Sequence, residues 1–177
     1  MPASVDRVTV NRAPVLTLWA AVVAERLGFD WDESLTMGRA VAGLNACSKG
    51  RALGIFHPRP RELEEKRRKL KHGEELQVDL LHRAVPVVRT KEGLRALSKG
   101  NPIAPESVHR YLEGKFGAAL AAVRKAMTML ARSLPSEELA AVAYRLYEEF
   151  RPEIPPGKKG WGVAGVLDLG RIRSMAR

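Results

Sequence analysis

The sequence predicts a mainly α-helical protein with a few short β-strands, built as a compact multi-helix single domain with a C-terminal appendage. Two observations lead to this prediction. Apolar residues recur at helical spacing in several long segments, whereas only short stretches favour strands. The length of 177 residues, with 45% hydrophobic content, supports one core but not two full domains. We assign residues 1–150 to a helical core domain and residues 151–177 to a basic Pro/Gly-rich appendage packed on that core.

The N-terminal part is predicted to form one strand and two helices. Residues 5–10 alternate in part, as in a short edge strand, and a helix with Trp19 in the core follows over residues 14–27. A second helix, capped by Asp32, runs through residue 44. Its inner face is slim, so that another backbone can approach closely, either a neighbouring helix or the same helix of a second subunit. A homo-oligomer formed through this face is therefore one prediction; the small residues are Gly38, Ala42 and Ala46.

Residues 23–41 resemble a helix-turn-helix motif, in which the second helix enters the major groove of DNA. In that interpretation the side chains that could contact base edges are those of Glu33, Thr36, Arg39 and Asn45. A plain helical hairpin explains the same residues.

The middle and the end of the chain continue the mainly helical pattern. A charged helix is expected over residues 61–72, and two short strands over residues 76–79 and 85–89, with Pro86 at a sheet edge. Further helices are predicted from Lys91, after Pro105, and over 118–134 and 135–150, followed by a short apolar piece and a final helix capped by Asp168.

An octapeptide of pattern G-L-x-A-x-S-K-G occurs twice, at 43–50 and at 93–100. Each copy closes an apolar, helix-like run, so both are predicted to be helix ends, with lysine at the negative end of the helix dipole and glycine after it. The copy at 43–50 is not a phosphate-binding P-loop, because no glycine precedes Lys49 and this lysine is expected at a helix C-terminus instead of between a strand and a helix. If the two copies converge, they form one shared polar site for a small phosphorylated substrate, made of Ser48, Lys49, Ser98 and Lys99.

No motif predicts a cofactor, a metal or a catalytic centre. Residues 160–165 match G-x-G-x-x-G, but too few residues follow for a dinucleotide-binding unit. The four histidines lack ligand spacing, and Cys47 has no second cysteine to bond with. The absence of an export signal or a membrane-spanning segment favours a cytoplasmic protein without membrane contact. These observations leave an enzyme open but favour a non-catalytic protein.

The charge balance predicts the partner. Thirty Lys and Arg stand against twenty Asp and Glu, a formal net charge of +10, which attracts polyanions. We therefore expect a small basic binding protein that contacts nucleic acid through phosphates, with a self-associating structural protein and an enzyme on a phosphorylated substrate as the alternatives. The candidate phosphate contacts are Arg51, Arg59, Arg67, Lys71, Lys158, Lys159, Arg171 and Arg173.

Overall fold

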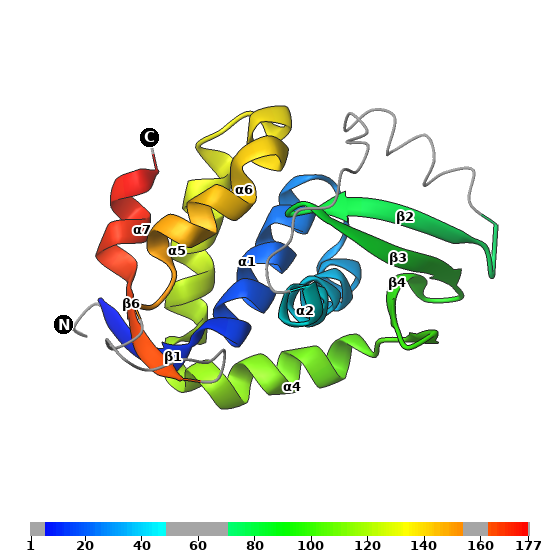
Figure 1. Cartoon of the computed structure of the whole chain (residues 1–177), viewed down its shortest axis with the longest axis horizontal. Helices are drawn as coiled ribbons and strands as arrows, with labels where there is room; N and C mark the ends of the chain where they lie inside the picture. The colour runs from blue at the N-terminus through cyan, green and yellow to red at the C-terminus, as the bar shows by residue number, and fades with distance from the viewer. Residues whose placement is uncertain (1–5, 49–70, 154–162, 177) are drawn as a thin grey trace.

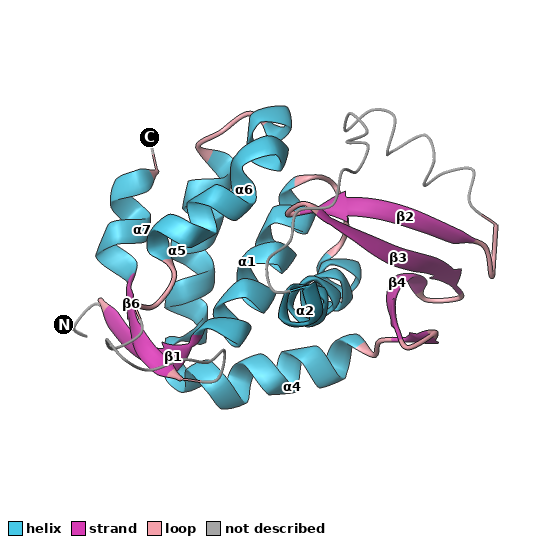
Figure 2. Cartoon of the chain, in the orientation of Figure 1, coloured by secondary structure: helices cyan, strands magenta, loops and turns pink. Residues whose placement is uncertain are grey.

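The computed structural model describes residues 6–48, 71–153 and 163–176, and it confirms a mainly helical chain with two small antiparallel sheets (Figures 1 and 2). In chain order the described elements are β1 (Arg7–Asn11), α1 (Arg12–Arg26), α2 (Trp31–Ser48), β2 (Glu75–Leu80), β3 (Arg83–Thr90), β4 (Gly93–Ser98), β5 (Asn101–Pro102), α4 (Pro105–Phe116), a 3₁₀ turn (Gly117–Ala119), α5 (Leu120–Arg132), α6 (Ser136–Phe150), β6 (Ala164–Asp168) and α7 (Leu169–Met175). The helix predicted over 61–72 lies largely outside the described residues.

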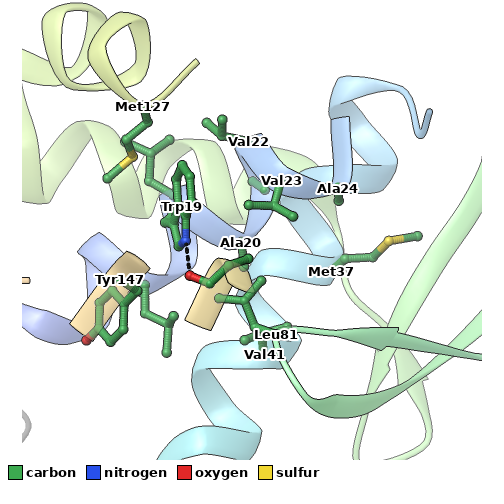
Figure 3. Packing of buried hydrophobic residues seen from close by; sticks show 14 of the residues in the cluster. Trp19, Ala20, Val22, Val23, Ala24, Met37, Val41, Leu81, Met127 and Tyr147 are labelled. Carbon is green, nitrogen blue, oxygen red and sulfur yellow. Dashed lines mark hydrogen bonds between the residues drawn. The ribbon is translucent and has the colours of Figure 1, made fainter. Parts of the chain in front are cut away.

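Helix α1 is the centre of the core. Every residue from Pro14 to Ala24 is buried, so this helix is apolar on all sides rather than amphipathic. Its Trp19 meets the ring of Phe150 edge to face, with 5.2 Å between the ring centroids. The Trp19 Nε1 donates a hydrogen bond of 2.9 Å to the carbonyl of Ala143, which is the dashed line at Trp19 in Figure 3. Trp19 thereby fixes α6 against α1, and the predicted core position of this tryptophan is confirmed.

The slim face of α2 packs against α1 of the same chain. A Cβ added at Gly38 would overlap the carbonyl oxygen of Thr17 and lie 3.0 Å from the backbone nitrogen of Ala21. Ala42 is also buried. Of the two partners that the sequence allows, the structure thus provides the neighbouring helix, and Gly38 is not accessible to a second subunit.

The two ends of the described chain meet in a small sheet. Strands β1 and β6 pair antiparallel, and the following helix α7 packs against α5 (Figure 1). The predicted cap of this final helix is confirmed, because the Asp168 carboxylate accepts bonds from the backbone nitrogens of Gly170 and Arg171 at 2.9 and 3.3 Å. The C-terminal segment also contributes fully buried side chains to the core, namely Leu167, Leu169 and Ile172.

The second sheet has the order β2-β3-β4-β5 and lies at the opposite end of the molecule from the β1-β6 sheet (Figure 2). Two-residue turns join β2 to β3 and β4 to β5; in both, each central residue has a positive φ, as a type I′ hairpin turn requires. Pro86 lies in β3, an inner strand of this sheet. It pairs with Gln77 of β2, but the pairing of β3 with β4 begins only at Val87, so Pro86 faces no strand on that side.

The second octapeptide is not a helix end, and the helix predicted from Lys91 is wrong. Residues Gly93–Ser98 form β4, while Lys99 and Gly100, with φ of 51° and 81°, form the turn into β5. The reason lies in α2, whose side chains cover the edge of β4. The backbone nitrogen of Leu94 donates to Glu33 at 2.9 Å, and that of Ala96 donates to Thr36 at 3.0 Å.

The start of α2 corrects two further predictions. The cap is Asp30 rather than Asp32. The Asp30 carboxylate accepts from the backbone nitrogen of Glu33 at 2.8 Å, and the Glu33 carboxylate accepts from the backbone nitrogen of Asp30 at 3.0 Å, which makes a capping box.

The helix-turn-helix interpretation is wrong, because a reading helix must expose its base contacts. Glu33 and Thr36 are buried under β4, Asn45 is buried too, and of the four proposed contacts only Arg39 is exposed.

Candidate functional site

The residues predicted from charge are spread over several parts of the chain. Those outside the described residues are Lys49, Arg51, Arg59, Arg67, Lys158 and Lys159, and the side chain of Ser48 is not described either. Lys71 is exposed just before β2, and Ser98 and Lys99 are exposed at the β4–β5 turn. On α7, Arg171 donates from Nε to the carbonyl of Glu149 at 2.8 Å, and Arg173 pairs with Asp6 at 3.1 Å.

A larger cationic site lies elsewhere, in a groove of about 990 Å³ between α1 and α5. Helix α5 explains it. The apolar side of α5 is buried in the core, and the 3.6-residue period places the polar side chains on the opposite side. From Leu120 to Arg132 this helix carries three cations and no carboxylate. The groove is lined by Val22, Glu25 and Arg26 of α1 and by Ala121, Arg124, Lys125, Thr128, Met129, Ala131 and Arg132 of α5.

The cations of this groove outnumber its single carboxylate. Arg124 pairs with Glu25 at 3.4 Å, and Arg26 donates to the carbonyl of Leu134 at 3.2 Å. Lys125 and Arg132 are exposed, and neither makes a hydrogen bond or ion pair within the described part of the chain. The groove therefore presents two uncommitted positive charges beside two that are held in place, which is an arrangement that attracts anions.

Two smaller hollows adjoin this groove at the start of α2. Trp31 and Arg124 line both of them, and their volumes are about 330 and 460 Å³. The guanidinium carbon of Arg124 lies 3.6 Å from the centroid of the Trp31 ring, a cation–π contact. His109 of α4 also lines both hollows. The cationic groove thus leads to an aromatic ring at one end.

A further hollow of about 500 Å³ lies among α1, α2 and α4 and contains Arg39 and Tyr111. Burial raises the pKa of the Tyr111 hydroxyl, against the opposing influence of the Arg39 charge. With one cation, this hollow is a weaker anion site than the α1–α5 groove.

Arg83 is a buried cation with a structural role. Its side chain is 1% exposed, and its Nη2 donates to Asn45 Oδ1 at 2.7 Å, an oxygen that also accepts from the Tyr144 hydroxyl at 3.1 Å. Asn45 belongs to the C-terminal half of α2, where the helix dipole favours a positive charge. Arg83 thus ties the start of β3 to α2 and α6. It lines none of the hollows above.

The described residues contain no group of three or more His, Cys, Asp or Glu side chains placed to hold a metal ion. Among them there is also no helix with the length and apolar character needed to cross a membrane.

Searches against protein-family models, curated proteins and solved structures found no match for this chain. The geometry of the grooves is therefore the basis for assigning a function.

The net charge of the chain does not distinguish the α5 groove, although the pattern of residues in α5 predicts its cationic side. The apolar positions Val123, Met127 and Leu130 predict the buried side of the helix. Once that side is fixed, Arg124, Lys125 and Arg132 must lie away from the core, and no acid within the helix can pair with them.

Proposed function

We propose that this chain is a cytoplasmic, non-catalytic protein that binds nucleic acid through its phosphates, and that the α1–α5 groove is the contact surface. The observation that carries the proposal is the row of cations on α5, a helix without a carboxylate. Lys125 and Arg132 are exposed and unpaired within the described residues, so a polyanion can bind them without first breaking an internal ion pair. Neutralised phosphates release counterions, which drives such binding.

The spacing of the cations suits a phosphate backbone. Lys125 and Arg132 are seven residues apart on α5, which corresponds to about 10 Å along the helix axis. The two side chains are therefore far enough apart to bind separate phosphates of one strand. Arg26 adds a cation from the opposite wall.

The cations predicted from the sequence extend the same proposal beyond the groove. They are Arg51, Arg59, Arg67, Lys71, Lys158, Lys159, Arg171 and Arg173. Arg171 and Arg173 already have acceptors within the chain, so we expect them to contribute less than Lys125 and Arg132.

The proposal is tested by fluorescence anisotropy with a labelled oligonucleotide of about 16 nucleotides, at salt concentrations from about 50 to 200 mM. The variant combines Lys125→Gln and Arg132→Gln. Its matched control combines Lys91→Gln and Arg145→Gln, which removes the same charge from two exposed residues outside the groove. Both double variants change only exposed side chains, so both should fold.

We expect the wild-type chain to bind at low salt and to weaken steeply as salt rises. Loss of two phosphate contacts should reduce the slope of log K against log salt by about 1.4 for a single strand. The control should keep the wild-type slope. No binding at low salt, or equal slopes for the two double variants, would reject the groove as the contact surface.

A further inference from the structure

The Trp31 ring is held in place at the end of the cationic groove. It is the first residue of α2, directly after the Asp30 cap, and it is partly exposed. Arg124 covers it at 3.6 Å and is itself held by Glu25 at 3.4 Å. The three side chains come from α2, α5 and α1, so the position of the ring is fixed by tertiary contacts and not by a loop.

The smaller of the two hollows beside Trp31 differs from the groove in character, whereas the larger one also contains the carboxylates of Asp32 and Glu106. The one of about 330 Å³ is lined mainly by apolar or small residues of α4, the 3₁₀ turn and α5, among them Leu112, Ala118 and Leu120. His109 and Glu113 supply its polar groups together with Arg124. A cationic groove that ends at an aromatic ring with apolar walls matches the two parts of a nucleotide, the phosphate and the base.

The groove also favours one form of nucleic acid. In a duplex the bases are stacked on one another, and only their edges are accessible in the grooves. A helix that reads those edges must stand out from its protein, because it enters a major groove about 12 Å wide. Helix α5 instead forms one wall of a groove and lies between α7 and α1 (Figure 1). A single strand can lie in such a groove with one base turned toward Trp31.

We infer that the ligand of the α1–α5 groove is single-stranded nucleic acid, with one base stacked at the Trp31–Arg124 pair. This inference rests on the proposed function, and it adds the strandedness of the ligand and a base-binding position. Stacking is tolerant of sequence because every base has a π face, so the site should show little preference among bases. Arg124 contributes both its charge and its cation–π contact, in line with its place at the junction of the groove and both hollows.

The test compares three labelled ligands of equal length: an ordinary single strand, a strand of the same phosphates without bases, and a duplex. Anisotropy is measured with the wild-type chain and with Trp31→Leu, which removes the aromatic face but keeps apolar bulk. Trp31→Phe is the matched control that keeps a ring. Circular dichroism and the unfolding midpoint of each variant verify its fold.

We expect the wild-type chain to bind the ordinary strand about tenfold or more tightly than the strand without bases, which is the scale of one stacked base. Trp31→Leu should lose this preference while keeping the affinity for bare phosphates, and Trp31→Phe should keep most of it. If Trp31→Leu fails to fold, the binding of strands with and without bases by the wild-type chain still tests whether bases contribute to affinity.

The outcomes separate the two proposals. Equal wild-type binding of strands with and without bases, or equal binding of strand and duplex, would overturn the base position and leave phosphate binding intact. Absence of binding to every ligand at low salt would overturn both.

Discussion

Replacement of Gly38 by alanine tests the central helix contact of this fold. Gly38 of α2 faces α1, and a Cβ built on it lies 3.0 Å from the backbone nitrogen of Ala21 and 3.2 Å from the Ala21 Cβ. The carbonyl oxygen of Thr17 is closer still, within overlap distance. Carbon atoms pack at about 3.5–4.0 Å, and two of these three obstacles are backbone atoms, which no rotamer change can move.

The magnitude follows from two opposing effects. Overpacking of a core costs about 1–3 kcal/mol and occasionally more, and the upper end applies where the backbones of two helices must separate. Alanine also has a higher helix propensity than glycine, by about 1 kcal/mol. The free energy of unfolding should therefore fall by about 2 kcal/mol, which lowers Tm by about 4–8 °C for a chain of this size.

Gly43→Ala is the matched control on the same helix. The nearest atom to its added Cβ is Arg39 Nη1, the end of a flexible side chain, at 3.5 Å. This variant should gain the propensity effect alone and stabilise the protein by up to about 1 kcal/mol. Urea denaturation followed by circular dichroism measures both variants, and the shifts should not depend on protein concentration because α1 and α2 belong to one chain. A Gly38→Ala variant as stable as the wild type, or a loss of stability that vanishes at high protein concentration, would refute the contact.

Two further predictions concern buried polar groups. The Tyr147 hydroxyl has no hydrogen-bond partner among the described residues, and burial raises the pKa of that hydroxyl above its ordinary value of about 10. The folded chain therefore keeps a proton that the unfolded chain releases, and stability should fall above pH 10 by up to about 1.4 kcal/mol per pH unit. Tyr147→Phe should remove this contribution and raise the unfolding free energy by about 1 kcal/mol at neutral pH, whereas an unchanged alkaline slope in thermal melts would contradict the assignment. Thr36→Val leaves the backbone nitrogen of Ala96 without an acceptor and should cost about 1–3 kcal/mol, and hydrogen exchange at that amide should quicken; an unchanged exchange rate would argue against the bond.

Much of the fold was predictable because its signals are local. The helix that follows Asp168 has its cap, its first turn and its apolar residues within eight positions, and its short-range bonds form as expected. The same holds for α5, whose apolar stripe alone predicts a helix of the observed length within a few residues. The positions of Trp19 and of the central helix followed from an apolar run that lacks any charge before Glu25.

The two octapeptides show where local signals fail. Residues 43–48 end α2, whereas 93–98 form β4, although both contain the pattern G-L-x-A-x-S. The difference comes from Glu33 and Thr36, which lie about sixty residues away in sequence and accept hydrogen bonds from β4. Leucine and alanine favour a helix by a few tenths of a kcal/mol per residue, less than the cost of leaving buried backbone donors unpaired. Sequence alone could not supply this pairing.

The candidate site also has one part that local sequence predicts and one part that depends on tertiary packing. The cations of α5 are predictable once the apolar stripe of that helix fixes its buried side, but a count of net charge gives no reason to prefer them over the other basic residues of the chain. The contact of Arg124 with Trp31 joins the start of α2 to α5 and depends on how those helices pack. The proposed base-binding position therefore depends on the tertiary structure.

Stability and function should be separable on α5. Like charges repel most on a helix when they stand three or four residues apart, yet Lys125 and Arg132 are seven apart, and neither pairs with an acid within the described residues. Their removal therefore neither relieves a strong repulsion nor breaks an ion pair, and the helix keeps the apolar side that holds it to α1. The variant with Lys125→Gln and Arg132→Gln should unfold at the wild-type midpoint while it loses affinity for phosphates. A large change in that midpoint would mean that the two side chains make structural contacts, and the loss of binding could then not be assigned to their charge.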